Sequence, residues 1–372
     1  MKIVIFSDNV APYRMSWANE MGKTNDVTFV YFKSKDLERN DAWLVKSSEY
    51  CSMLRLPAIV IKNKAFTFEV IKYIKHHSID VVIFDGYGIP SNILGILYMN
   101  LKKRSYYINV DGICSDGKEN VLKIIIKKIL FSKYSNILCG SKATNAVLQK
   151  YGIDPLCITN HPFTSLYKED IYNDIATKQE KQQFREKYGM VEKHIVISVG
   201  RFTYLGGYGK GYDVLIKAAE KMDDSIGWYI VGGQPTEEFA NIVRDKKLFN
   251  VHFVDFLEKE TLKEYYRASD VFVLMTVSDV WWLVVNEAMS CGLPVITTDK
   301  CMAGLDLVKD GENGYIVKVG DYEALIEKLS TLLRDEKLIC NYSNKSLETI
   351  IPYTIENMAK THIGVFGEMK NC

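Results

Sequence analysis

The chain has 372 residues, enough for about two domains at the usual size of roughly 150 residues each. Lys and Arg number 47 against 46 Asp and Glu, so the formal charge of +1 gives the chain no basic excess for binding nucleic acid. Apolar residues make up 47% and charged residues 25%, which is typical of globular proteins and excludes a largely disordered chain. We therefore expect a compact two-domain protein with no nucleic-acid partner.

The cysteines and the start of the chain predict a cytoplasmic protein. No two of the eight cysteines form a C-x-x-C pair and the six histidines show no H-x-x-x-H spacing, so we expect reduced thiols and no structural zinc. The start, MKIVIFSDN, has four successive apolar residues before Ser7, fewer than a signal peptide needs. No run approaches the roughly 18 apolar residues of a membrane span.

Short runs of Val, Ile, Phe and Tyr alternate with longer stretches of helical pattern. Continuous apolar runs are typical of strands covered on both faces, and their alternation with helices indicates parallel sheets built from βα units. In the first half the expected strands span residues 3–6, 27–32, 81–84, 106–110 and 137–139. In the second half they span residues 195–199, 228–231, 252–256, 271–275, 295–297 and 315–317. The predicted fold class is α/β, with two doubly wound domains.

A polar, Lys- and Glu-rich stretch at residues 167–188 separates the two strand series and marks the predicted domain boundary. We assign residues 1–165 with 353–372 to the first domain and residues 166–352 to the second. Residues 356–366 have a helical pattern and no strand after them. This helix either crosses back to the first domain or simply caps the second.

The chain does not match the familiar phosphate-binding motifs when it is compared with them position by position. The glycine-rich run 206–211 resembles a P-loop, but Tyr204 stands where its first glycine belongs and Gly211 where Ser or Thr must reach magnesium. No G-x-G-x-x-G follows the first strand, where residues 8–14 read DNVAPYR. No D-x-D pair is present to hold a metal against a nucleotide diphosphate. These absences exclude an ATPase of the P-loop class and argue against a nicotinamide dehydrogenase.

The first candidate residues follow the strand 195–199. Gly200 and Arg201 come directly after it, and Lys210 lies on the glycine-rich loop beyond. Arg and Lys suit a diphosphate, because Arg binds phosphate oxygens in pairs and Lys supplies a point charge. An exposed loop with solvated cations explains the same spacing equally well.

The second group of candidates follows the strand 271–275. From Leu283 the pattern is that of a helix, and backbone amides at a helix start favour an anion. Asp279 and Glu287 add two carboxylates, which accept hydrogen bonds from a hydroxyl-rich ligand. The simpler alternative, which the spacing favours, is an N-terminal cap at Ser278 or Asp279 with Glu287 in solvent.

Two further features lie in the first domain. Asp111 follows the strand 106–110, where an acidic side chain could face a ligand; an Asp111-Gly112 turn is the simpler explanation. Residues 118–133, KENVLKIIIKKILFSK, have the pattern of a basic amphipathic helix. Such a helix either lies on an anionic membrane surface or covers the first domain with its lysines in water.

The segment 281–296, WWLVVNEAMSCGLPVI, together with residues 199–201 and the loop to Lys210, resembles glycosyltransferase family 4. The resemblance extends over residues 181–333, including DGENGY at 310–315, and is weaker but in the same order through the first half. It implies retaining enzymes of the GT-B class, with two facing Rossmann-like domains and an interdomain cleft. The second domain then holds the nucleotide sugar and the first the acceptor, and the final helix returns to the first domain.

The resemblance also implies roles for single residues. Arg201 and Lys210 correspond to the family's diphosphate-binding cations, Asp279 to the glutamate that holds the transferred sugar, and Glu287 to the glutamate that binds ribose. The implied donor site comprises Gly200, Arg201, Lys210, Asp279, Trp282, Leu283, Val284 and Glu287. The implied catalytic residues are Asp111, Arg201 and Lys210, and the implied acceptor-binding residues are Arg14 and Asp111.

Three departures from the family pattern concern the donor site. Asp279 is one methylene shorter than the usual glutamate, which changes its reach to a sugar hydroxyl. Trp282 replaces a glycine that lets the backbone approach the donor. The interval from Arg201 to Lys210 is about four residues longer than usual, which adds a loop rich in Tyr and Gly. A further departure lies in the first domain, where residues 9–14 stand in place of a glycine pair that many relatives carry.

The predicted function is retaining, metal-independent transfer of a sugar from a nucleoside diphosphate sugar to an acceptor hydroxyl. The resemblance implies a lipid-linked or surface-polysaccharide acceptor, no cofactor and no metal. The start of the chain and the pattern of residues 118–133 predict a protein in the cytoplasm or at the cytoplasmic face of an anionic membrane. Two alternatives stay open. One is a nucleotide-sugar epimerase of GT-B architecture, and the other is a non-catalytic partner subunit of a glycosyltransferase, which the changes at Asp279 and Trp282 suggest.

Overall fold

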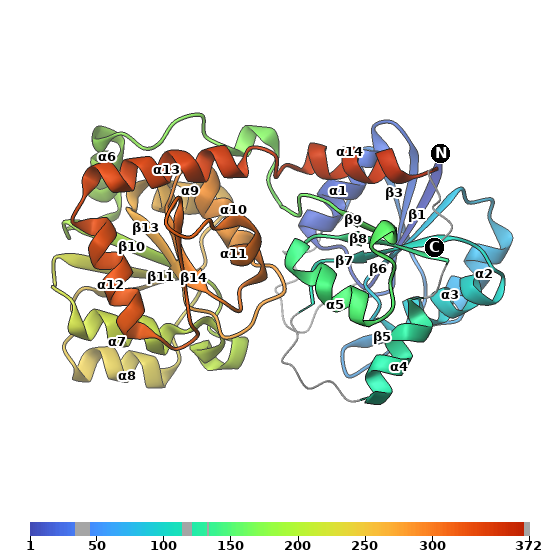
Figure 1. The fold of residues 1–372 in the computed structure, drawn as a ribbon, viewed down its shortest axis with the longest axis horizontal. Coiled ribbons are helices and arrows are strands. Elements are labelled where there is room, and N and C mark those ends of the chain that lie inside the picture. Colours follow the sequence, from blue (N-terminus) through green and yellow to red (C-terminus); the bar gives the residue numbers. More distant parts are fainter. Residues whose placement is uncertain (34–44, 114–120, 132–133, 368–372) are drawn as a thin grey trace. The chain divides into compact units, whose positions relative to one another are not determined.

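The computed structural model describes residues 1–33, 45–113, 121–131 and 134–367. The chain forms two compact units (Figure 1): unit 1 is Met1–Tyr167 with Tyr353–Cys372, and unit 2 is Lys168–Pro352. The first crossing between them therefore lies two residues beyond the predicted boundary at 165. Each unit has its own hydrophobic core.

Unit 1 is built on a sheet of seven parallel strands in the order β3-β2-β1-β6-β7-β8-β9. Its strands are β1 (Lys2–Ser7), β2 (Asp26–Tyr31), β3 (Cys51–Arg55), β6 (Val81–Asp85), β7 (Tyr106–Val110), β8 (Ser135–Cys139) and β9 (Ile158–Asn160). A separate antiparallel hairpin consists of β4 (Ile59–Ile61) and β5 (Lys64–Phe66). Because β1 pairs with both β2 and β6, the strand order reverses between β1 and β6. Such a reversal is where open α/β sheets bind ligands, at the carboxyl ends of the strands.

Unit 1 also contains the last helix of the chain. Its helices are α1 (Pro12–Gly22), α2 (Glu69–His76), α3 (Pro90–Leu101), α4 (Val121–Leu130), α5 (Asn145–Lys150) and α14 (Ile355–Val365), with short 3-10 turns at Lys142–Thr144 and Pro155–Cys157. Helix α14 packs against α1. The amide of Ile355 donates to the carbonyl of Leu166 at 2.7 Å, and the Tyr107 hydroxyl donates to the carbonyl of Val365 at 2.7 Å. These contacts attach both ends of α14 to unit 1.

Unit 2 is built on six parallel strands in the order β12-β11-β10-β13-β14-β15. They are β10 (His194–Val199), β11 (Ile226–Val231), β12 (Val251–Val254), β13 (Val271–Leu274), β14 (Val295–Thr298) and β15 (Gly314–Val317). The helices are α6 (Lys178–Tyr188), α7 (Tyr212–Lys221), α8 (Glu237–Asp245), α9 (Lys259–Ala268), α10 (Leu283–Ser290), α11 (Met302–Leu307), α12 (Tyr322–Leu333) and α13 (Glu336–Ile350), with 3-10 segments at Lys168–Asp170 and Tyr204–Lys210. The strand order reverses between β10 and β13.

The structure confirms the predicted α/β class, and every predicted strand is present within a few residues of its expected bounds. Sequence reasoning missed β3, β4, β5 and β9. Strand β3 mixes buried and exposed positions, while β4, β5 and β9 have three residues each, so none of them shows a continuous buried apolar run. None of the described helices is both long and apolar enough to cross a membrane.

The cysteines do not fully match the expectation of reduced thiols. Cys157 is disulfide-bonded, so the expectation is wrong at this position. The free cysteines among the described residues are Cys51, Cys139, Cys291, Cys301 and Cys340.

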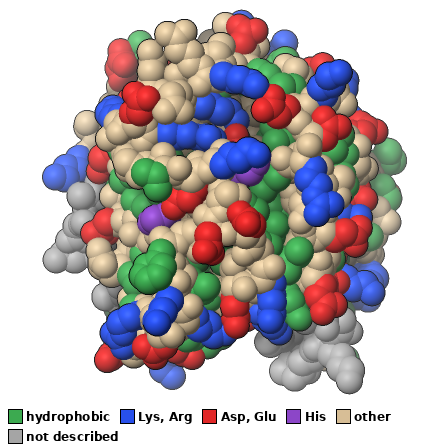
Figure 2. All heavy atoms as spheres, turned by 90° about the vertical axis from the view of Figure 1, so that its left-hand side faces the viewer, with side chains coloured by type: hydrophobic (Ala, Val, Ile, Leu, Met, Phe, Trp, Pro, Cys, Tyr) green, Lys and Arg blue, Asp and Glu red, His purple; other side chains and the backbone are tan. Residues whose placement is uncertain are grey.

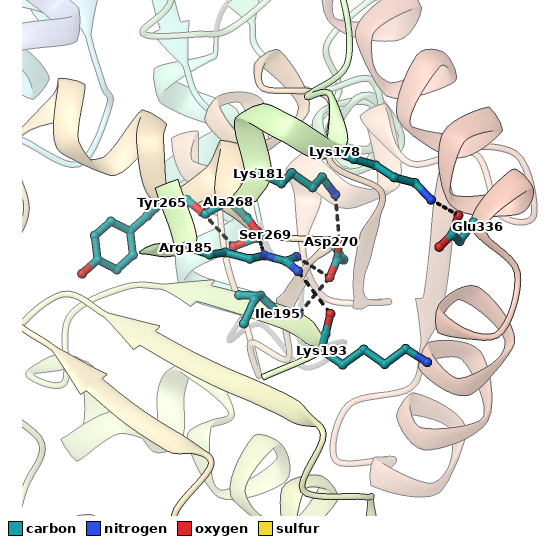
Figure 3. A network of polar contacts seen from close by, with 10 residues as sticks. All are labelled: Lys178, Lys181, Arg185, Lys193, Ile195, Tyr265, Ala268, Ser269, Asp270 and Glu336. Carbon is teal, nitrogen blue, oxygen red and sulfur yellow. Dashed lines mark hydrogen bonds and ion pairs between the residues drawn. The ribbon is translucent and has the colours of Figure 1, made fainter. Parts of the chain in front are cut away.

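A polar network fastens α6 to the amino-terminal edge of the unit 2 sheet (Figure 3). Asp270, directly before β13, accepts hydrogen bonds from Lys181 Nζ at 2.7 Å, Arg185 Nη2 at 2.8 Å and the backbone amide of Ile195 at 2.9 Å. The three donors hold the pKa of this buried carboxyl below its usual value, although burial alone would raise it. In the same view Lys178 and Glu336 form a solvent-exposed ion pair on the helices α6 and α13.

We expect the Asp270→Asn variant to lower the free energy of unfolding by about 2 kcal/mol, because the amide keeps the size of the side chain but loses its charge-assisted hydrogen bonds. The matched control is Glu336→Gln, which breaks only the exposed pair with Lys178 and should leave stability unchanged. Thermal unfolding of both variants measures the difference. Equal effects of the two changes would show that the Asp270 network does not anchor α6.

Candidate active site

The predicted donor residues lie at the reversal of strand order in unit 2. Strand β10 ends at Val199 and β13 ends at Leu274, and the two strands are neighbours in the sheet. Arg201 follows the first and Asp279 the second. Because the carboxyl ends of parallel strands meet at one edge, these segments lie at the position where open α/β sheets bind ligands.

The glycine-rich segment after β10 folds inward. Its backbone has left-handed φ values of 49° at Leu205, 63° at Gly206 and 98° at Gly207. The carbonyl of Gly209 accepts a hydrogen bond from the Thr276 hydroxyl at 2.8 Å, and a Cβ at Gly211 would lie 2.1 Å from the carbonyl oxygen of Met275. The segment therefore packs directly on the chain that leaves β13, and the alternative of a solvated loop is wrong.

This folding buries Lys210 completely. Its side chain has no exposed surface, and its Nζ has no hydrogen-bond partner. The ammonium group lies over the indole ring of Trp282, as in a cation–π contact. A Cβ at Gly200 would lie 2.7 Å from Lys210 Cε, so the lysine stem requires glycine at this position. A buried lysine without a partner is costly to protonate unless an anion occupies the site.

Burial and the neighbouring charges together set the pKa of Lys210. Burial lowers the pKa of Lys210 to about 6, against the opposing effect of Asp279, and the nearby Arg201 lowers it further. Burial also raises the pKa of Asp279 well above its usual value, while Lys210 and hydrogen bonds from the backbone amides of Trp281, Val280 and Trp282 oppose this effect. Lys210 is thus mainly uncharged at neutral pH in the ligand-free protein, and a diphosphate would favour its protonation.

Helix α10 begins directly after this group. Its N-cap is Trp282, which makes no side-chain cap hydrogen bond, so the alternative of a Ser278 or Asp279 cap is wrong. The first amides of a helix have no partner within the helix, and those around Leu283 and Val284 are therefore available to an anion. The Trp281 indole donates to Asn286 Oδ1 at 3.0 Å and fixes the segment that leads into the helix.

Glu287 lies one turn into α10 and is half-buried. Its carboxylate is close to the hydroxyl of Tyr266 on α9, whose pKa is raised by burial and then by the charge of Glu287. The structure therefore groups Gly200, Arg201, Asp279 and Trp282 around Lys210, and places Glu287 on the following helix.

Sequence reasoning missed two neighbours of this group. The Tyr204 hydroxyl donates to the carbonyl of Ser278 at 3.4 Å, and its ring centroid lies 6.2 Å from that of Trp282. Cys301 pairs with Asp279 in an isolated parallel bridge. Tyr204 lies two residues before the glycine-rich run, and Cys301 follows the strand β14. No local pattern marks either residue as part of the site.

The candidates of unit 1 meet at the other reversal, between β1 and β6. Arg14 on α1 donates to both carboxylate oxygens of Asp111 at 2.8 and 2.6 Å, and lies 3.0 Å from Asp85 Oδ1. Asp85, at the end of β6, also accepts from the Ser7 hydroxyl at 2.7 Å and from Asn109 Nδ2 at 3.0 Å. The result is one continuous polar cluster at the carboxyl edge of the sheet.

The cluster gives the two predicted acceptor residues, Arg14 and Asp111, different roles. Arg14 is buried, and although burial opposes it, the carboxylates of Asp111 and Asp85 raise the pKa of Arg14. Its guanidinium therefore forms ion pairs with carboxylates of the protein itself. Burial raises the pKa of Asp111 while Arg14 opposes this effect, and its side chain keeps 24% exposure. Asp111, held in a two-point contact, is the member of the pair that can face a ligand, and the Asp-Gly turn does not account for it.

A second buried pair in unit 1 joins α14 to the sheet. The rings of His161, after β9, and His362, on α14, lie 4.3 Å apart, and His362 also meets the ring of Trp17 on α1 at 5.0 Å. None of the four ring nitrogens has a hydrogen-bond partner. Burial lowers the pKa of His161 to about 3 and that of His362 well below its usual value, so both histidines are neutral when folded.

These histidines should make unit 1 sensitive to acid. Because their pKa values are lowered on folding, the unfolded chain binds more protons below about pH 6.5 and stability falls as the pH drops. We expect a loss of about 2 kcal/mol per histidine between pH 7 and pH 5. Thermal unfolding of a His161→Leu/His362→Leu double variant should show a correspondingly smaller change over this interval. The same pH dependence in variant and wild type would contradict this account.

Comparisons with known proteins agree with this geometry. Residues 180–349 match the family model of glycosyl transferases group 1. The chain is 22% identical over 324 residues to the N,N'-diacetylbacillosaminyl-diphospho-undecaprenol alpha-1,3-N-acetylgalactosaminyltransferase of Campylobacter jejuni, covering 84% of this chain and 82% of that enzyme. It is 28% identical over 192 residues to the N-acetyl-alpha-D-glucosaminyl L-malate synthase of Bacillus anthracis, covering 49% of this chain and 48% of that enzyme. Among solved structures, Anabaena HepE in complex with UDP matches with a TM-score of 0.77 at 15% identity, over 99% of this chain and all of that one.

The structural likeness confirms the GT-B fold that the resemblance implies. The matched segment 180–349 lies within unit 2 and contains every predicted donor residue. Fold, family model and relatives together support glycosyltransferase activity that uses a nucleotide sugar.

Proposed function

We propose that this protein is a retaining, metal-independent glycosyltransferase of family 4. It would transfer a sugar from a nucleoside diphosphate sugar to an acceptor hydroxyl of a lipid-linked or surface-polysaccharide intermediate. The observation that carries the proposal is Lys210, a fully buried lysine without a hydrogen-bond partner at the strand-order reversal, beside Arg201 and the start of α10. A diphosphate satisfies all three groups at once.

In this proposal unit 2 supplies the leaving-group chemistry. The bond between the anomeric carbon and the diphosphate oxygen breaks, and negative charge develops on the diphosphate. The acceptor oxygen forms the new bond to the anomeric carbon on the same face, and the acceptor proton passes to the leaving diphosphate. Arg201, Lys210 and the first amides of α10 stabilise that charge, which assigns the electrostatic role to this chain's own groups without a metal or cofactor. Asp279 and Glu287 would accept hydrogen bonds from hydroxyls of the donor.

Unit 1 would receive the acceptor, with Asp111 as the residue that positions its hydroxyl. The ion pair with Arg14 orients the Asp111 carboxylate, so we assign Arg14 to positioning. A lipid-linked acceptor is supported by the relative from Campylobacter jejuni, whose name specifies a diphospho-undecaprenol substrate. UDP is the first nucleotide to try, because Anabaena HepE was crystallised with it.

The same proposal includes contact with the cytoplasmic face of an anionic membrane through α4. Leu130 of this helix and the adjoining Phe131 are buried, so α4 covers unit 1 as the simpler alternative expects. Ile125, Ile126 and Ile129 nevertheless keep 47%, 46% and 55% exposure. The helix thus has a second apolar side that faces solvent.

The proposal is tested by incubating the purified protein with UDP- and GDP-sugars and lipid diphosphate acceptors, and by detecting the product by mass spectrometry. The anomeric coupling constant of the product, measured by NMR, should match that of the donor, and the rate should be unchanged by EDTA. An inverted anomer would overturn retention, and loss of activity in EDTA would overturn metal independence.

The partner-subunit alternative has one structural observation in its favour, because the Trp282 ring covers Lys210, where the family has glycine. Tight nucleotide binding without transfer to any acceptor would favour it. Conversion of the donor sugar without an acceptor would favour the epimerase.

A further inference from the structure

Lys210 in unit 2 can contact a ligand only after a neighbouring side chain has moved. Figure 2 shows acidic and basic side chains interspersed over one face of the molecule, in contact with solvent. Lys210 differs from such surface groups, because it has no exposed area and its Nζ has no hydrogen-bond partner in the described part of the chain. The Nζ lies against the indole ring of Trp282, which is itself half-buried. The indole therefore covers the lysine on its solvent side.

The groups on the other sides of Lys210 are fixed by the fold. Gly200, directly after β10, lies against the lysine stem, where a Cβ would be 2.7 Å from Lys210 Cε. Asp279, after β13, and Cys301, after β14, are both buried, and their backbones pair in a parallel bridge. Trp282 is the partly exposed neighbour, so a ligand that reaches Lys210 from solvent meets this side chain first.

The two adjacent tryptophans are held in different ways. The indole nitrogen of Trp281 donates to Asn286 Oδ1 at 3.0 Å, and this side chain is buried. The indole nitrogen of Trp282 is also buried, but it has no hydrogen-bond partner among the described residues. Its ring meets Lys210 and, at 6.2 Å between centroids, the ring of Tyr204. The indole of Trp282 can thus leave Lys210 without breaking a side-chain hydrogen bond.

We propose that Trp282 makes occupation of the donor site depend on a diphosphate, because its indole covers Lys210 until a diphosphate displaces it. Hydrogen bonds between an ammonium group and phosphate oxygens are stronger than the contact of the same group with a ring face. A nucleoside without phosphate brings no charge to the site and leaves the indole in place. The inference rests on the proposed function, since it concerns the regulation of the same donor site.

Displacement of the indole is coupled to uptake of a proton. Burial lowers the pKa of Lys210 to about 6. Asp279 and Cys301 oppose this effect, and the charge of Arg201 adds to it. At pH 8 the covered lysine is therefore mainly uncharged, and protonating it costs a factor of about 100 in affinity, because the pH exceeds the pKa by about two units. Removal of the indole would let water reach Nζ, return the pKa toward its ordinary value and so remove this cost.

The test is calorimetric titration of the wild type and Trp282→Gly at pH 8 with UDP and GDP, and with uridine and guanosine as ligands that lack phosphate. Glycine is accepted at the N-cap position of a helix, so the variant should fold, and thermal unfolding checks this. Trp282→Gly should bind the preferred nucleotide about 10- to 100-fold more tightly than the wild type, with unchanged nucleoside affinity. It should also take up less than half as much proton, as measured in two buffers of different ionisation enthalpy.

Two further variants complete the experiment. Trp282→Phe keeps an aromatic ring over Lys210, so it should retain the proton uptake of the wild type. It should lose the change in tryptophan fluorescence that the wild type shows with the nucleotide and not with the nucleoside. Phe249→Ala is the matched control, because it removes an 84% exposed ring just before β12, at the amino-terminal edge of the unit 2 sheet. This control should change neither affinity nor proton uptake.

Equal nucleotide affinity of the wild type and Trp282→Gly would overturn the inference and leave the proposed function intact. An equal gain in nucleoside affinity would also overturn it, because Trp282 would then only fill space in the site. Nucleotide binding by Trp282→Gly alone would overturn displacement, since the indole would then close the site permanently. If neither protein binds a nucleotide, the proposed function fails and the inference fails with it.

Discussion

Replacement of Lys210 by methionine should lower kcat for sugar transfer roughly 100- to 1000-fold, the usual cost of removing one preorganised group that stabilises developing charge. Methionine keeps most of the lysine stem, which packs between Gly200 and the Trp282 ring, so the variant removes charge with little change in packing. Its thermal stability should equal or exceed that of the wild type, because the buried and unpaired Nζ is costly in the ligand-free protein.

Steady-state kinetics of Lys210→Met and of Lys221→Ala measure this difference. Lys221 ends α7 on the surface of the same unit, so its removal tests for a general effect of lost positive charge. In addition, nucleotide binding by the wild type near pH 8 should take up a proton, since burial lowers the pKa of Lys210 to about 6 in the ligand-free state. A kcat within a few-fold of the wild type would show that Lys210 does not stabilise the leaving group.

Replacement of Arg14 by alanine should destabilise unit 1 by about 3–5 kcal/mol, the typical cost of breaking a buried ion pair from one side. The change leaves the carboxylates of Asp85 and Asp111 together without their shared cation. Arg55→Ala is the matched control in unit 1, because Arg55 is exposed and its loss should have no measurable effect.

Thermal and urea unfolding of the two variants and of Arg14→Ala/Asp111→Ala test this prediction. The double variant should regain part of the lost stability, because one of the two unpaired carboxylates is gone. Loss of less than about 1 kcal/mol in Arg14→Ala would contradict the claim that this cluster is a structural support for Asp111.

The main sheets could be predicted from sequence because their strands are covered on both faces and appear as continuous apolar runs. The hairpin β4–β5 could not, since its apolar residues face solvent and the rule that links such runs to burial fails there.

The residue types of the donor site were also predictable, but their burial was not. Spacing could not decide whether Lys210 was solvated, because its burial depends on contacts of Gly209 and Gly211 with the chain after β13, far away in sequence. For the same reason sequence reasoning could not identify the partners of Arg14, because Asp85 ends β6 and Asp111 follows β7. In both cases the missing information is long-range contact.

The most direct test of the donor site is calorimetric titration of the wild type, Arg201→Ala, Glu287→Ala and Arg334→Ala with UDP, GDP and their sugar conjugates. Arg334 is an exposed residue at the end of α12 and serves as the control. We expect the wild type and Arg334→Ala to bind one nucleotide selectively, and Arg201→Ala and Glu287→Ala to bind it at least tenfold more weakly. Absence of binding by the wild type, or equal binding by all four proteins, would contradict the assignment of the donor site.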